Sequence, residues 1–152
     1  MTRQTLNQYR LRDFPPLFCS LAATGEVGLN GRFRAEFVGP AWLRSLAGPA
    51  LALGGLKGWW GKTFDGQGNG MNLVRLDSDI CPRLPVRLQQ LPSRLDGQPT
   101  MTVVYPPTSP YPWPWIVDEL RWLDAETMLG MTIVTKAGLH RFPFPFVLHV
   151  VD

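Results

Sequence analysis

A lysine stands among aromatic residues and glycines in the segment GWWGKTF, which runs from Gly58 to Phe64. If the segment is one strand, Trp60, Lys62 and Phe64 share one face and Trp59 lies on the other. Lys62 then either faces water or points into an apolar interior, where its charge needs a carboxylate or an anionic ligand. Because lysine is rarely buried, the pattern favours the position that faces water.

Charged residues also interrupt the segment WIVDELRWLD near the C-terminus. Asp118 alternates with Leu120 and Trp122, and Arg121 falls on the opposite face of the same predicted strand. A charge on an otherwise apolar inward face indicates a ligand cavity, since an ordinary core would leave that charge unpaired. A surface ion pair on a strand exposed at the outside of the barrel explains the pattern equally well.

The run YPPTSPYPWPW, from Tyr105 to Trp115, contains five prolines and four aromatic residues. Such a run can adopt polyproline II structure and serve as a peptide ligand for an aromatic groove. The favoured interpretation is a rigid loop whose aromatics, Trp113 among them, fold over one end of the domain.

The sequence gives little support for a metal site, a serine hydrolase or a cofactor. His140 and His149 are nine positions apart, and Cys19 and Cys81 have no partners at ligand spacing, so we expect no metal site. No Gly-x-Ser-x-Gly elbow occurs, and nothing indicates a cofactor. The glycines of GQGNG suit a hairpin turn because no helical pattern follows them.

These residues must be positioned by a mainly β chain. Fifteen glycines and fifteen prolines divide the sequence into short segments that alternate with period two. The pattern predicts eight strands, at 32–38, 57–65, 71–77, 84–91, 100–105, 116–123, 128–135 and 142–150. In the last strand Pro143 and Pro145 predict an edge or a bulge, with regular pairing only from Phe146 onward.

Helices are expected in two places only. One begins after Pro40 and is stopped by Gly48 and Pro49, with a further turn open at 50–53, and a shorter one lies within 11–23, after Pro15 and Pro16. Consecutive hairpins make a meander, and a meander of about eight strands tends to close into a barrel because closure removes exposed edges. We therefore expect one antiparallel barrel domain over 1–152, with these short helices capping an end.

Composition narrows the classes of partner. The net charge is +3, but the twelve arginines and three lysines are scattered, whereas nucleic-acid binding needs a basic stripe. No apolar run reaches about 18 residues, and Asp13 with two prolines interrupts what a signal peptide would need. We expect a cytoplasmic protein without a membrane span and without a nucleic-acid partner, in which a homodimer is possible.

The order GRFRAEFVG, a short helix, GWWGKTF, TMTVVY and IVDELRWLDAETMLGM resembles the bacterial and fungal GXWXG and DUF4334 proteins, whose function is mostly unassigned. Phe33 and Ala35 replace a tryptophan and a glycine of the family's first motif. The resemblance spans about residues 29–150 and implies a lipocalin-like (calycin-type) barrel. The matching residues are Gly31, Arg32, Gly58, Trp59, Gly61, Lys62, Phe64, Tyr105, Asp118, Arg121, Asp124, Thr127, Leu129 and Gly130.

A barrel of this size either is filled by side chains or holds one small ligand. The sequence predicts binding of a small apolar or amphipathic molecule, with Lys62 or Arg121 anchoring an acidic group and Trp60, Phe64, Trp113 and Trp122 supplying apolar area. A cofactor-free isomerase or lyase, with Asp118 as base and Tyr105 or Lys62 as its acid partner, is the alternative. A third is a protein-interaction module that uses the loop rich in proline and aromatics.

Overall fold

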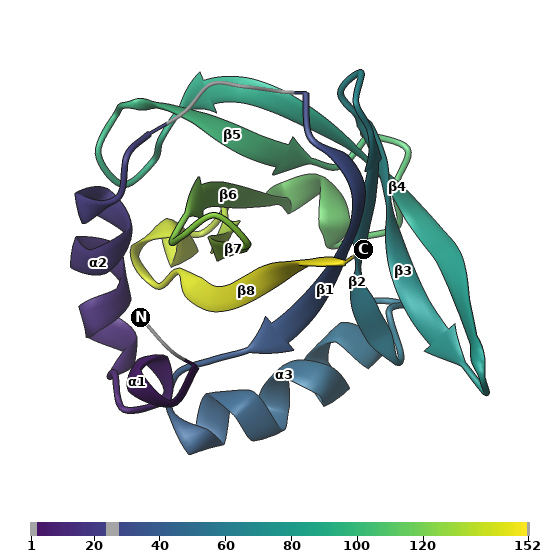
Figure 1. Ribbon diagram of the computed structural model, residues 1–152, viewed down its shortest axis with the longest axis horizontal. Coiled ribbons are helices and arrows are strands. Elements are labelled where there is room, and N and C mark those ends of the chain that lie inside the picture. The colour runs from purple at the N-terminus through teal and green to yellow at the C-terminus, as the bar shows by residue number, and fades with distance from the viewer. Residues whose placement is uncertain (1–2, 24–27, 152) are drawn as a thin grey trace.

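Eight antiparallel strands form a closed barrel in which each strand pairs with its neighbours along the chain and β1 pairs with β8 (Figure 1). The computed structural model describes residues 3–23 and 28–151. The strands are β1 (Asn30–Phe37), β2 (Trp59–Asp65), β3 (Asn69–Leu76), β4 (Asp79–Pro92), β5 (Pro99–Val104), β6 (Ile116–Trp122), β7 (Thr127–Val134) and β8 (Phe144–Val151). This confirms the predicted fold class and number of strands.

The first turn of the meander uses glycine as the sequence predicts. Gly66 and Gly68 adopt φ angles of 81° and 87° between β2 and β3, a region that favours residues without a Cβ. Asp65 accepts hydrogen bonds from the backbone N–H groups of Gln67 and Asn69 and so closes the turn. The hairpin fixes which residues of β2 and β3 face each other.

A β-bulge in β2 overturns the predicted alternation at its start. The register with β3 shifts between Trp59 and Gly61, so Trp60 is an extra residue. Trp60 therefore points outward, where the guanidinium of Arg32 lies 5.1 Å from its ring centroid. Trp59, not Trp60, shares the inner face with Lys62. The period-two pattern contains no sign of this insertion.

The last strand differs from its prediction in two ways. β8 begins at Phe144 and pairs with β7 from that residue, although its pairing with β1 starts only at Phe146, as expected. The connection that precedes β8 contains the 3-10 helix η3 (Leu139–Arg141). Phe142 consequently lies outside the strand and is exposed.

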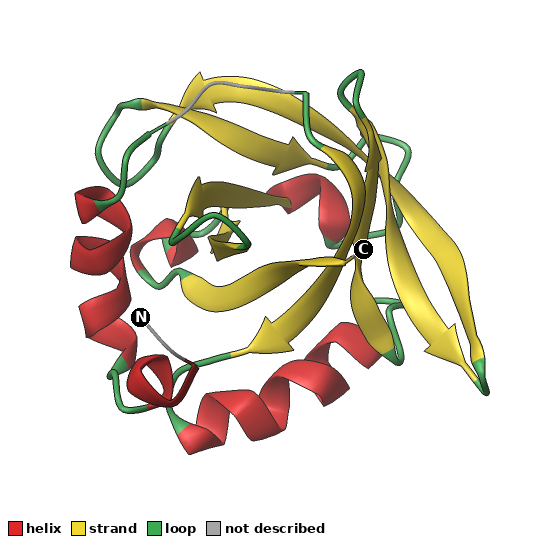
Figure 2. Ribbon diagram, in the orientation of Figure 1, coloured by secondary structure: helices red, strands yellow, loops and turns green. Residues whose placement is uncertain are grey.

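Helices are longer and more numerous than expected (Figure 2). They are α1 (Arg3–Asn7), α2 (Phe14–Ser20) and α3 (Ala41–Leu53), with the 3-10 turns η1 (Leu11–Asp13) and η2 (Trp113–Trp115). The prediction that Gly48 and Pro49 stop α3 is wrong. Pro49 removes only the bond to the carbonyl of Ser45, an exposed residue whose carbonyl water can reach, and the helix ends at Gly54.

Two apolar clusters lie on the two sides of the barrel wall. The inner cluster fills part of the barrel and includes Phe33, Phe64 and Leu120. The outer cluster packs Phe14 and Phe18 of α2 against the outer face of β7 and β8. Part of the outer wall is therefore as dry as the interior, and charged residues on that wall are not automatically exposed.

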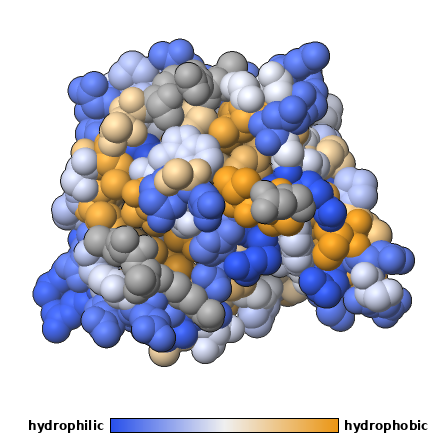
Figure 3. Space-filling model, in the orientation of Figure 1, coloured by the Kyte–Doolittle hydropathy of each residue, from blue (hydrophilic) through white to orange (hydrophobic). Residues whose placement is uncertain are grey.

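None of the helices in residues 3–23 and 28–151 has the length and hydropathy that crossing a bilayer requires. On the face shown in Figure 3, hydrophobic residues form patches that hydrophilic residues interrupt.

Gly61 is required by the close approach of β1 to the bulge. A Cβ at this position would collide with the carbonyl oxygen of Phe33. We predict that Gly61→Ala lowers the free energy of unfolding by about 1–3 kcal/mol, the usual range for overpacking. Gly48→Ala is the matched control, because its Cβ would point into open space within α3. It should stabilise the protein by up to about 1 kcal/mol. Urea denaturation compares the two, and equal effects would contradict the assigned bulge.

Candidate functional site

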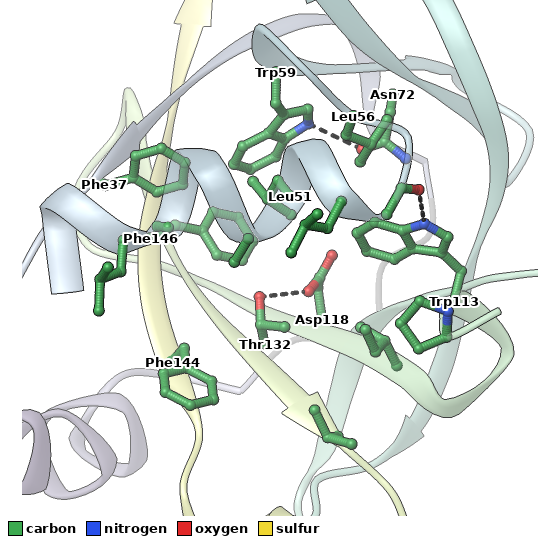
Figure 4. A pocket seen from close by; sticks show the side chains of 18 of the residues that line it. Phe37, Leu51, Leu56, Trp59, Asn72, Trp113, Asp118, Thr132, Phe144 and Phe146 are labelled. Carbon is green, nitrogen blue, oxygen red and sulfur yellow. Dashed lines mark hydrogen bonds between the residues drawn. The ribbon is translucent and has the colours of Figure 1, made fainter. Parts of the chain in front are cut away.

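One end of the barrel encloses a cavity of about 490 Å³ beneath α3 (Figure 4). Its wall is almost entirely aromatic and aliphatic. The strands contribute Phe37, Trp59, Ile116, Val134, Phe144 and Phe146, α3 contributes Leu43, Leu46, Ala47, Ala50, Leu51 and Leu53, and Trp113 covers one side. Pockets of this size and character hold small organic molecules.

Trp113 belongs to the loop that follows Tyr105, as the sequence predicts. Its indole N–H donates to the carbonyl oxygen of Gly54 over 2.6 Å, which ties the loop to the end of α3. Its ring lies 4.9 Å from that of Tyr105, centroid to centroid. Only a glycine fits at position 54, because a Cβ there would stand 2.9 Å from the Trp113 ring. The loop thus forms a fixed wall of the cavity.

Lys62 lies in the floor of this cavity, with only 1% of its surface exposed. Its Nζ is 3.3 Å from Oδ2 of Asp118, which is 4% exposed and projects from β6 on the facing wall. The expectation that Lys62 faces water is therefore wrong, and the alternative of an inward lysine paired with a carboxylate is correct. A buried lysine is tolerated here because Asp118 compensates its charge.

Neutral groups complete the hydrogen bonding of the pair. Lys62 donates to Oδ1 of Asn72 over 2.7 Å and to the hydroxyl of Tyr105 over 3.3 Å. Trp59 donates its indole N–H to the same Asn72 oxygen, and Thr132 donates to Oδ1 of Asp118 over 2.8 Å; Figure 4 shows both bonds. The Lys62 ammonium therefore has two neutral acceptors in addition to its charged partner Asp118.

Tyr105 has an unused hydrogen-bond donor. Its hydroxyl accepts from Lys62 and, over 3.4 Å, from Nδ2 of Asn72. The orientation of the Asn72 amide is fixed, because its oxygen already accepts from Trp59 and Lys62. No hydrogen bond donated by Tyr105 is found in the described part of the chain. The phenol proton is free to bind an acceptor in the cavity.

The pKa values agree with this arrangement. Burial alone would lower the pKa of Lys62, but Tyr105 and Asp118 outweigh it and raise the pKa above the ordinary 10.5. Burial raises the pKa of Tyr105 above 10.0, against the opposing effect of Lys62. At neutral pH Lys62 is charged and Tyr105 keeps its proton.

Arg121 is buried on the outer side of the wall and does not reach the cavity. It forms a bidentate pair with Asp96, both distances 2.8 Å, and donates to Thr100 and to the carbonyl of Phe18. The Phe18 ring lies 4.5 Å from its guanidinium. Its side chain holds α2 and the β4–β5 connection against the barrel. The sequence suggested either a charge inside the barrel or an exposed surface ion pair. A buried ion pair on the outer wall is a third arrangement, which was not predicted.

Three further residues predicted to supply apolar area to the ligand do not line the cavity. Phe64 and Trp122 face the interior but lie in the filled half, apart from the cavity lining, and Trp60 lies outside the barrel. Asn72 and Thr132 line the cavity but were not predicted from the sequence. Asn72 sits as a polar residue in the alternating strand MNLVRLD, which is the signal that could have identified it.

Within residues 3–23 and 28–151, no three side chains of His, Cys, Asp or Glu gather in a way that could hold a metal ion.

Comparison with known proteins supports the fold alone. No family model matches the chain, and no curated protein does. A crystal structure of a protein from Thermomonospora curvata is similar, with a TM-score of 0.74, 18% identity, and coverage of 98% of this chain and 93% of the other.

The buried ion pair should show strong energetic coupling. We predict that Asp118→Asn and Lys62→Met each lower the free energy of unfolding by about 3–5 kcal/mol, because each leaves one buried charge unpaired. The double variant removes both charges and should lose less than the sum of the two. A double-mutant cycle by urea denaturation measures this coupling, and the exposed Lys57→Met, expected within about 0.5 kcal/mol of wild type, is the control. Additive losses would contradict the pairing.

The ion pair between Arg121 and Asp96 should make the stability of the fold depend on pH in the acid range. Hydrogen bonds, first of all from the Arg121 guanidinium, lower the pKa of Asp96 from 3.8 to about 2. The ionised form therefore stabilises the fold above pH 3.8, and this contribution is lost as the pH falls through about 2. We predict that Asp96→Asn is less stable at neutral pH and loses less stability over the acid range. Urea titrations at several pH values, with the exposed Asp79→Asn as control, check this, and an unchanged acid profile in Asp96→Asn would refute it.

Proposed function

We propose that the protein binds a small, neutral and mainly apolar molecule with one hydrogen-bond acceptor, such as a carbonyl oxygen. The observation that carries this proposal is the combination of an apolar cavity with a polar floor, which consists of Lys62, Asn72, Tyr105 and Asp118. Most of the ligand surface would lie against α3 and the aromatic walls, and a polar group would meet the floor. Burial of apolar area supplies affinity, and the polar floor fixes orientation.

The charge balance of the floor favours a ligand without a net charge. Lys62 and Asp118 form a pair of zero net charge, so an acidic group near Lys62 would also approach the Asp118 carboxylate. The ammonium group already donates to Asn72 and Tyr105 and is paired with Asp118. An anionic ligand would have to displace one of these acceptors, and this favours a neutral ligand over the acidic one that the sequence suggested.

The Tyr105 hydroxyl is the group best suited to recognise the ligand. It borders the cavity, keeps its proton, and has two donors that polarise its oxygen and leave its O–H unpaired. A ligand carbonyl would satisfy this donor. Asp118 also lines the cavity and offers a carboxylate to a second ligand group that donates a hydrogen bond.

An enzyme remains the second candidate because Asp118 and the Tyr105 hydroxyl face the same cavity. In a cofactor-free isomerase, Asp118 would take a proton from the carbon beside a ligand carbonyl. Tyr105 would hydrogen-bond the developing oxygen anion, and Asp118 would return the proton to another carbon. The contacts of the carboxylate oppose this, since its oxygens are already engaged by the Lys62 ammonium and the Thr132 hydroxyl. The interaction module is less favoured because Trp113 of its loop is buried in the cavity wall.

The family resemblance adds no activity to these proposals. A GXWXG-like barrel would share the segment that carries Gly61 and Lys62, and in this fold that segment supplies the bulge and the charged floor.

A fluorescent neutral ketone tests the proposal. Prodan, a naphthyl ketone with one carbonyl acceptor, should bind with a blue-shifted emission, because the cavity is apolar. We predict that Tyr105→Phe weakens binding by about 2- to 12-fold, the equivalent of one neutral hydrogen bond. Fluorescence titration gives the dissociation constants, and Tyr111→Phe is the control, since Tyr111 is exposed and lies outside the cavity lining.

Two outcomes would overturn the proposal. One is the absence of any prodan binding by the folded protein. The other is tighter binding of dansylaminoundecanoic acid, an anionic probe, with that affinity lost in Lys62→Met. Thermal melts of every variant separate a loss of affinity from a loss of fold.

A further inference from the structure

Exposed apolar side chains concentrate at the end of the barrel that carries the cavity. Eight large hydrophobic residues are exposed in the described part of the chain, and six of them lie in α3 or in the 105–115 and 135–143 connections. We call these six the apolar rim: Trp42, Leu46, Leu53, Tyr111, Leu139 and Phe142. Leu53 is 93% exposed and Phe142 58%. Grouped exposure of this kind marks an interaction surface.

The apolar rim is continuous with the wall of the cavity. Trp42, Leu46 and Leu53 are exposed and also line the cavity, so one side of α3 joins the outside surface to the interior. Phe142 stands two residues before Phe144, and Tyr111 directly precedes Pro112, and both of these neighbours line the cavity. An apolar ligand could pass from a partner at the rim into the cavity without entering water.

The three segments that carry the apolar rim hold charges of one sign, and the acidic residues Asp77 and Asp79 at this end of the barrel lie outside them, at the β3–β4 turn. The segments 41–58, 105–115 and 135–143 contain Arg44, Lys57, Lys136 and Arg141 but no aspartate or glutamate. The acidic residues of the β6–β7 turn, Asp124 and Glu126, lie at the opposite end of the barrel. The rim therefore combines exposed apolar groups with four basic residues.

We propose that this end of the barrel docks on the surface of an anionic lipid bilayer, which delivers or receives the ligand. Tryptophan, phenylalanine and leucine enter the interfacial region of a bilayer, and nearby lysines and arginines bind anionic head groups. A second copy of the chain fits less well, because a two-fold contact would bring these basic side chains together. The inference rests on the proposed function, since it names the source of the apolar ligand.

Vesicle flotation of the full chain tests the docking surface. The probes are vesicles of phosphatidylcholine alone and of phosphatidylcholine mixed with phosphatidylserine. We expect binding to the anionic vesicles only, and a loss of at least about 25-fold in Lys136→Glu/Arg141→Glu, at about fivefold per basic residue. The matched control, Arg87→Glu/Arg94→Glu, makes the same change in net charge at exposed positions in β4 and the β4–β5 connection. It should stay within about twofold of wild type.

A second pair of variants tests the apolar contribution. Leu139→Ser/Phe142→Ser removes exposed groups that do not line the cavity, so prodan binding without vesicles should stay at the wild-type level while vesicle binding falls. Val150→Ser, at the opposite end, should leave both unchanged. Equal vesicle binding by the rim and control variants overturns the inference, as does no binding by wild type.

Two further outcomes separate the inference from the proposed function. A protein that binds prodan but not anionic vesicles keeps the proposed function and loses the docking surface. A protein that docks through the rim but does not bind prodan supports the docking surface and loses the proposed function. A dimer in vesicle-free solution that Leu139→Ser/Phe142→Ser dissociates, with vesicle binding unchanged, assigns the rim to a second copy and overturns the inference.

Discussion

The ion pair between Lys62 and Asp118 is the constraint on which the rest of the interior depends. Two charges taken out of water need each other and need acceptors and donors for their remaining hydrogen bonds. Asn72, Tyr105 and Thr132 supply these from three further segments of the barrel wall. The polar layer divides the barrel into a half filled by aromatic and aliphatic side chains and a half that is hollow. The hollow half can exist because the filled half and the outer cluster around α2 provide the packing that the cavity lacks.

Local rules predicted the strands because alternation, glycine turns and proline positions act within a few residues. They failed where the outcome depends on distant segments. The bulge that turns Trp60 outward exists because Gly61 allows β1 to approach. Lys62 is buried because Asp118 lies across the barrel, 56 positions later in the chain. Arg121 is buried because α2 and Asp96 cover the outer wall. Alternation in one strand reports two faces but not which face is covered, or by what.

The proposed function follows from the position of the polar layer at the bottom of an apolar cavity. A pair of opposite charges presents no net charge to a ligand, and the unpaired Tyr105 proton presents a single directed donor. Such a floor discriminates by hydrogen-bond complementarity, because a ligand without an acceptor leaves the buried donor unsatisfied. The basic, apolar rim at the same end extends this logic outward, since it offers a partner surface that suits the source of a poorly soluble molecule.

The central claim is that the cavity holds a neutral ligand whose acceptor meets Tyr105. A crystal structure of the protein with prodan tests it most directly. We predict the naphthalene rings between α3 and the aromatic wall, with the ketone oxygen at hydrogen-bond distance from the Tyr105 hydroxyl and the Lys62–Asp118 pair intact. Prodan bound outside the barrel, or inside it with the ketone turned away from Tyr105, would contradict the claim.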